Sequence, residues 1–277
     1  QHTGIISYVP FWDREYERIL SKLEEYMGSG GKIISLNTLK WPMKKTITLD
    51  IDDEAGGRLA ADYLLGVDPA SYAVFSSATL THDLREYAFC GRIRGKKSEA
   101  DLSVFHVAEN ELRREFILPE IDRMLDQMKR PAGMMTVCTE FTGLILTSCE
   151  KRGWKYGADF ELVGYDFAPR YGDYIQVPRV VQPFREMGSL AMDKLYHLLL
   201  GDEVQSEILK PILQTGEEIQ KTDGKFHFDR VADCNSDHRH SGRNASSCVE
   251  QGEEYGKSRQ LHKQLETTGS WRNDVLL

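Results

Sequence analysis

Short apolar runs alternate along the chain with longer stretches in which apolar residues recur about every 3.6 positions. The short runs predict buried strands, and they span residues 4–9, 32–37, 46–51, 72–76, 102–107, 133–138 and 162–165. The longer stretches predict helices. The first follows a capping Asp13 and ends at Gly28, and the others span 54–65, 119–129, 141–151 and 185–200. This alternation is typical of an α/β protein with parallel sheets.

The composition changes near Gln220. Residues 221–277 are rich in Ser, Asp, Arg, His, Gln and Glu and contain few large apolar side chains. A segment of this kind buries too little apolar surface to fold alone, so we expect 220–277 to be a polar, disordered tail. Four of its residues carry metal-binding groups, Cys234, His238, His240 and Cys248. Their spacing matches no common zinc pattern, so we predict no metal site there.

Charge and composition narrow the class of protein. The 277 residues include 35 Lys and Arg against 43 Asp and Glu, giving a formal net charge of −8, which does not favour nucleic acid through the overall field. No window approaches the roughly 18 continuous apolar residues of a membrane span, and residues 1–10 lack the regions of a signal peptide. The five cysteines contain no C-x-x-C pair, as expected of reduced thiols. We therefore expect a cytoplasmic protein with no membrane contact.

Common catalytic and cofactor motifs are absent from the sequence. It contains no G-x-S-x-G or H-E-x-x-H, and the pair Gly56-Gly57 lacks the spacing of a dinucleotide loop. The run GRIRGKKS, residues 91–98, is one residue too short between its glycines for a phosphate loop. We interpret that run as a basic surface turn and predict neither enzyme activity nor a cofactor.

Polar residues follow several of the predicted strands at the edge where open α/β sheets bind ligands. Asp166 follows the strand 162–165, Thr139 and Glu140 follow 133–138, and Arg85 opens a helix soon after 72–76. An Arg and an acceptor-only Asp facing one cleft suit the hydroxyls of a neutral polyol. The alternative is that Asp166 caps a following turn and Arg85 forms a surface salt bridge, and spacing alone does not separate the two.

Six stretches together resemble a known family. They are ITLDIDDEAGGRLAADYLL, LREYAFCGRI, MMTVCTEFTGLILTSCEKRGW, FELVGYDFAP, VVQPFREMGSLAMDKLYHLLLG and ILKPIL, in this order. They are similar to the effector-sensing domain of the lactose-repressor and galactose-repressor (LacI/GalR) family of bacterial transcription regulators, over about residues 4–219. The resemblance implies the type I fold of periplasmic binding proteins, with two doubly wound parallel-sheet subdomains, three crossovers and a ligand cleft between them.

The resemblance also implies domain limits. Residues 1–219 would form the effector-binding domain. Its N-terminal subdomain would comprise about 1–66 and 184–201, and its C-terminal subdomain about 70–182 and 207–219.

Site residues carry over by motif. Arg85 in R-E-Y-A-F matches the family's effector-binding arginine, and Asp166 in G-Y-D matches an acid that accepts hydrogen bonds from ligand hydroxyls. Gln182 and Phe184 in V-Q-P-F match a pair that lines the cleft, and Thr139 and Glu140 stand where the family has Asn-Asp.

Three further candidates have less specific roles. Asp52 or Asp53 matches an acid near the cleft. Tyr8, like Trp12, follows the first predicted strand, and is a candidate either for an aromatic face against a sugar ring or for a core position.

The family's mechanism is a shift of populations: a sugar-like effector favours the closed form of a homodimer and so repositions its DNA-reading heads. We expect DNA contact only through such a helix-turn-helix head, which we do not find in this chain. The residues 4–9 resemble the family's second strand, so we expect a reading frame cut at the front. The family's sheet has the strand order 2-1-3-4-5, in which the first strand lies between the second and the third. Without that first strand, the strands 4–9 and 32–37 would either have a gap between them or pair directly. A transport-type sugar-binding protein is the alternative function, and an enzyme on this fold is a third.

Overall fold

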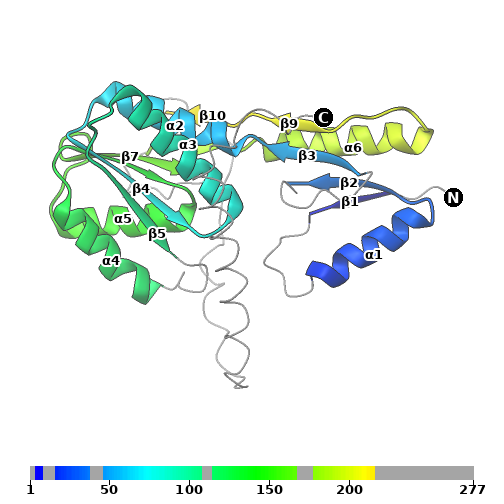
Figure 1. Cartoon of the computed structure of the whole chain (residues 1–277), viewed down its shortest axis with the longest axis horizontal. Coiled ribbons are helices and arrows are strands. Elements are labelled where there is room, and N and C mark those ends of the chain that lie inside the picture. The colour runs from blue at the N-terminus through cyan, green and yellow to red at the C-terminus, as the bar shows by residue number, and fades with distance from the viewer. Residues whose placement is uncertain (1–3, 9–15, 38–45, 108–113, 167–176, 216–277) are drawn as a thin grey trace, which may run out of the picture. The chain divides into compact units, whose positions relative to one another are not determined.

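The computed structural model describes residues 4–8, 16–37, 46–107, 114–166 and 177–215. Within these ranges the chain forms two sheets, each with its own helices (Figure 1). The expected α/β class with parallel sheets is confirmed. The tail 220–277, the capping Asp13 and Trp12 lie outside the described residues.

The first sheet has the order β1-β2-β3-β9, and all of its pairings are parallel. Its strands are β1 (Gly4–Ser7), β2 (Lys32–Leu36), β3 (Ile47–Ile51) and β9 (Glu207–Leu209), and the helices that contact it are α1 (Tyr16–Gly28) and α6 (Phe184–Leu200). Strands β1 and β2 pair directly, with Gly4 opposite Lys32, which is the second of the two arrangements expected for them. Apolar residues of β2 and β3 pack against Met187, Ala191 and Leu195 of α6.

The second sheet has the order β10-β8-β7-β6-β4-β5, and only β10 is antiparallel to its neighbour. Its strands are β4 (Ser71–Ser77), β5 (Leu102–Val107), β6 (Ala132–Thr136), β7 (Phe160–Tyr165), β8 (Arg179–Val181) and β10 (Ile212–Gln214). Every residue of β4 and β6 is buried, as expected of central parallel strands covered on both faces.

Four helices cover the second sheet. They are α2 (Asp53–Val67), α3 (Leu80–Lys96), α4 (Arg114–Gln127) and α5 (Thr139–Lys151). Figure 1 shows α2 and α3 on one face of this sheet and α4 and α5 on the other. The largest fully buried side chains of this core include Tyr72, Phe75, Phe89 and Phe141.

The chain passes between the two sheets three times: from β3 to α2, from β8 to α6, and from β9 to β10. Helix α2 contacts α3, β6 and β7 of the second sheet, whereas we had expected residues up to 66 in the first subdomain. Strand β9 pairs with β3 of the first sheet, whereas we had expected 207–209 in the second subdomain.

Two local expectations were wrong. The run 91–98 is not a surface turn, because residues 91–96 form the last turns of α3. Arg85 does not open that helix, since α3 begins at Leu80 after the N-cap Thr79. This helix was not predicted because it contains Gly91 and Gly95. Glycine in a helix interior lowers helix stability by about 1 kcal/mol relative to alanine, so the two glycines indicated a helix end.

In the described part of the chain, no helix is both long and apolar enough to cross a membrane.

Candidate functional site

Arg85 is a buried cation at the end of the second sheet. Its side chain is 6% exposed, and its Nε donates a hydrogen bond of 2.7 Å to Oδ1 of Asp53, whose side chain is 0% exposed. Its Nη1 donates to the main-chain oxygen of Val137, also at 2.7 Å. The guanidinium carbon lies 3.7 Å from the centre of the Tyr165 ring, within the range of a cation–π contact. Arg85 is therefore held by an acid, a carbonyl and an aromatic face.

The glycine pair at the start of α2 permits this arrangement. A Cβ atom at Gly56 would lie 2.2 Å from the Tyr165 hydroxyl oxygen, and one at Gly57 would lie 2.2 Å from the main-chain oxygen of Arg85. Only glycine lets α2 approach α3 and β7 so closely. Gly56-Gly57 therefore has a packing role.

Asp166 follows β7 and is locked to the next strand. Its φ of 59° lies in the left-handed region, which Asp tolerates better than most residues. Its main-chain N–H donates to Val180 at 2.6 Å. Its carboxylate accepts from the Gln182 main-chain N–H at 3.1 Å and from Gln182 Nε2 at 2.5 Å. The structure thus brings together the predicted residues Asp166 and Gln182.

Electrostatic interactions link the Arg85–Asp53 pair to Asp166. Burial raises the pKa of Asp53, the neighbouring charges of Asp166 and Asp52 raise it further, and Arg85 opposes them. Burial lowers the pKa of Arg85, but Tyr165, Asp53 and Asp166 outweigh burial and leave that pKa above its ordinary value. Burial also raises the pKa of Tyr165. Arg85 therefore remains a cation beside two carboxylates.

Three buried polar atoms in this cluster have no hydrogen-bond partner in the structure: Asp53 Oδ2, the Tyr165 hydroxyl and Gln182 Oε1. Buried polar atoms are nearly always paired, and an unpaired one costs about 1–3 kcal/mol. Two of the three, the Asp53 and Gln182 oxygens, can only accept hydrogen bonds. The cluster therefore has unused capacity for a group that donates them.

Three more of the predicted site residues are close in sequence to members of this cluster: Thr139, Asp52 and Glu140. The Thr139 hydroxyl donates to the Tyr165 main-chain oxygen at 3.2 Å. Asp52 is the N-cap of α2, where its side chain accepts from the Ala55 N–H at 2.7 Å, so Asp53 rather than Asp52 contacts Arg85. The Glu140 side chain lies outside the described part of the structure.

Phe184 and Tyr8 belong to elements of the first sheet. Phe184 is the first residue of α6 and is 54% exposed, and Tyr8 follows β1 and is 52% exposed. Tyr8 therefore does not occupy the core position that was its alternative role.

The structure excludes one of the two interpretations of Arg85 and shows two partners that the sequence did not indicate. A surface salt bridge for Arg85 is excluded, because both partners are buried. Tyr165 and the Val137 carbonyl were missed as partners of Arg85. The G-Y-D motif contained the first signal, because its Tyr precedes the predicted ligand acid, whereas no side-chain pattern marks a carbonyl.

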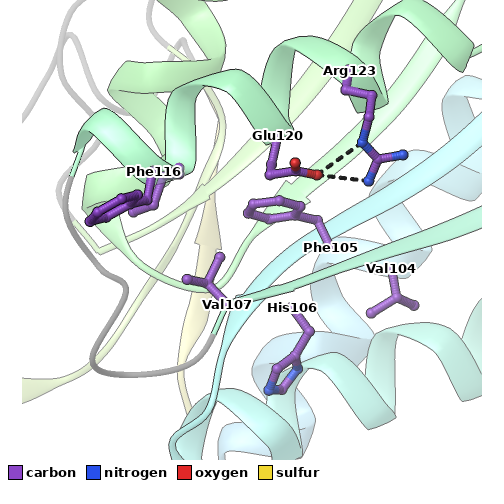
Figure 2. Close-up of a pocket in the computed structure, with 8 residues that line it drawn as sticks. Val104, Phe105, His106, Val107, Phe116, Glu120 and Arg123 are labelled. Carbon is purple, nitrogen blue, oxygen red and sulfur yellow. Dashed lines mark hydrogen bonds and ion pairs between the residues drawn. The ribbon is translucent and has the colours of Figure 1, made fainter.

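A pocket of about 240 Å³ lies elsewhere on the second sheet, between β5 and α4 (Figure 2). Phe105, Val107, Phe116 and Ile117 line its apolar part, and the ion pair between Glu120 and Arg123 lies beside it. Arg85, Asp53 and Asp166 are not among its lining residues.

Comparison with solved structures gives closely related folds at low sequence identity. A LacI transcriptional regulator from a Rhodococcus species is 18% identical, with 76% of this chain and 75% of that chain covered and a TM-score of 0.60. A LacI family regulator from Enterococcus faecalis V583 with bound ribose is 16% identical, with 76% and 75% covered and a TM-score of 0.59. The xylose-binding transcription activator xylR is 19% identical, with 76% and 57% covered and a TM-score of 0.62.

No protein-family model and no curated protein matches the sequence. The structural neighbours are nevertheless consistent with one another, since LacI-type regulators recur among them. The chain therefore has the periplasmic-binding-protein-like fold of the effector-binding domains of LacI-family transcription regulators.

Proposed function

We propose that this chain is the ligand-sensing domain of a transcription regulator and that it binds a small neutral sugar or related polyol. The observation that carries the proposal is the buried cluster of Arg85, Asp53, Asp166 and Gln182 with its unpaired acceptor atoms. It lies where β4, β6 and β7 end, the usual ligand edge of an open α/β sheet. Structural neighbours bound to ribose and cellobiose support the choice of ligand class.

The hydrogen-bonding capacity of the cluster suits hydroxyl groups. Asp53 Oδ2 and Gln182 Oε1 would accept from ligand O–H groups, and Asp166 would share its carboxylate between Gln182 and the ligand. Arg85 uses Nε and Nη1 within the protein. We therefore assign Arg85 a positioning role, holding Asp53 and Tyr165 in place. With two carboxylates and one guanidinium, the cluster has a formal charge of −1, which disfavours sugar phosphates and uronic acids.

The positions of Asp53 and Gln182 in the chain suggest how ligand binding would change the conformation. Asp53 begins α2 directly after the crossing from β3, and Gln182 precedes the crossing from β8 to α6. A ligand bound to both would act on two of the three segments that join the sheets. We propose that binding changes the angle at these segments, as in hinge closure, and that a homodimer in the cytoplasm transmits this change to a DNA-reading head.

Thermal unfolding of the purified chain against neutral sugars, nucleosides and sugar phosphates tests the proposal. A ligand at 100 times its Kd contributes about 2.7 kcal/mol, a rise in Tm of several degrees. Gln182→Ala and Asp166→Asn should abolish the shift. Asp62→Asn is the matched control, because Asp62 of α2 forms an exposed ion pair with Arg92 of α3 and has no proposed ligand role.

Two results would count against the proposal. Absence of a shift with every ligand would contradict sensing, and a shift that survives in both Gln182→Ala and Asp166→Asn would contradict this site. Chemical change of the bound sugar, followed by chromatography, would contradict the expectation that the protein is not an enzyme.

A further inference from the structure

A second polar cluster lies between α3 and the edge strand β5, and the proposed sensing site does not use it. Asp83 and Glu86 are three residues apart on α3, so they share one face of the helix. His106 comes from β5, where successive side chains alternate between the two faces of the sheet. Figure 2 shows the Phe105 and His106 side chains on opposite sides of β5. The imidazole therefore meets the two carboxylates of α3.

The three side chains converge closely. His106 Nδ1 lies 2.9 Å from Glu86 Oε2, and His106 Nε2 lies 3.9 Å from Asp83 Oδ1. One ligand atom from each residue can be chosen so that all three lie within 4.8 Å of one another. Two ligands of a tetrahedral ion with bonds of about 2.0 Å are about 3.3 Å apart. In the structure Glu86 faces Nδ1 of His106 and Asp83 faces Nε2, so an ion bound to one ring nitrogen requires the other carboxylate to turn towards that nitrogen.

We propose that Asp83, Glu86 and His106 form a binding site for one divalent transition-metal ion of the zinc class. An imidazole with two carboxylates is a donor set that suits Zn²⁺, Co²⁺ or Ni²⁺ better than Mg²⁺ or Ca²⁺, which take oxygen ligands. Water would complete the coordination. The ion would tie the edge strand β5 to α3, the helix that also carries Arg85.

The charges around the cluster favour a cation. The two carboxylates carry a formal charge of −2, and the nearby Arg85 is already engaged by Asp53. The adjacent His82 has its own partner, since its Nδ1 is 2.7 Å from the Ser77 hydroxyl.

The test uses the full chain after treatment with a chelator. Co²⁺ is titrated while its visible absorption is recorded, and Tm is measured with and without Zn²⁺. At a Zn²⁺ concentration of 100 times Kd, Tm should rise by roughly 5–10 °C. His106→Ala should lose the absorption and the rise, and Glu86→Gln should weaken binding by about tenfold or more.

Two controls identify the site. His197→Ala removes an exposed imidazole that lies 2.8 Å from the single carboxylate of Asp202, and it should bind metal as the wild type does. A variant with Cys234, His238, His240 and Cys248 all changed to Ala removes the metal-binding groups of the tail, and it should also bind normally.

Each outcome decides the proposal. It is overturned if the wild type binds neither ion, if His106→Ala binds as well as the wild type, or if the tail variant abolishes binding. If His106→Ala lowers the Tm of the metal-free protein, metal binding by Glu86→Gln decides between the outcomes. This substitution preserves the shape of the side chain and removes its charge, so unchanged metal binding in it would also overturn the proposal.

Discussion

Gly57→Ala is expected to destabilise the protein, because the added Cβ on α2 clashes with the backbone of α3. The added Cβ would lie 2.2 Å from the Arg85 main-chain oxygen, so α2 and α3 must separate by 1.2 Å to restore an ordinary contact of 3.4 Å. Overpacking of this kind costs about 3 kcal/mol, and the better helix propensity of alanine offsets about 1 kcal/mol. We therefore expect a net loss of about 2 kcal/mol, measured by urea unfolding, and a fall in Tm of about 4–8 °C.

Gly91→Ala is the matched control for that substitution. Gly91 lies inside α3, and a Cβ there meets nothing within 4 Å. The propensity gain acts alone at this position, so the variant should be more stable by about 0.5–1 kcal/mol. Equal stability of Gly57→Ala and the wild type would refute the assigned contact between α2 and α3, and destabilisation by Gly91→Ala would refute the assumed gain in helix propensity.

Two further predictions concern buried charge. Arg85→Ala should cost about 3–5 kcal/mol, because Asp53 is left buried without its partner, and Arg85→Leu with Asp53→Asn should recover part of that loss in a double-mutant cycle of urea unfolding. Burial lowers the folded-state pKa of His82 to about 3, below its ordinary value of 6.5, so its contribution to stability is present above pH 6.5 and is lost as pH falls towards 3. Between pH 6 and 4 this loss should approach about 1.4 kcal/mol per pH unit, and His82→Gln should remove it; an unchanged slope in that variant would assign the acid sensitivity to other groups.

The long elements could be predicted from the sequence because their periodicity extends over many residues. The seven predicted strands all form, with ends displaced by no more than two residues, because continuous apolar runs match fully buried parallel strands. Strands β8, β9 and β10 have three residues each, too few for a periodic signal, and their pairing depends on tertiary contacts. Helix α4 begins at Arg114, before the expected start at Pro119.

The site could be predicted only in part. Asp166 and Gln182 are brought together as the motifs imply. The partner of Arg85 could not be chosen, because Asp52 and Asp53 are adjacent in sequence, and the choice depends on which of them caps α2. Once Asp52 occupies the N-cap and accepts from Ala55, Asp53 lies in the first helical turn and faces Arg85. A pairing across 32 residues leaves no mark in a single sequence.

Stability and ligand sensing should separate experimentally, although both depend on the same cluster. Arg85 has its charge satisfied inside the protein, so changing it disturbs folding first and binding as a consequence. Gln182 keeps an unpaired buried oxygen, so Gln182→Ala removes an unfavourable atom together with a proposed ligand contact. It also removes the hydrogen bond from Nε2 to Asp166, but Asp166 still accepts from the main-chain N–H of residue 182. The expected result is a variant that unfolds nearly like the wild type and no longer responds to ligand. If instead both variants lost stability and response in the same proportion, the cluster would be a structural core of α2, α3 and β7 rather than a sensor.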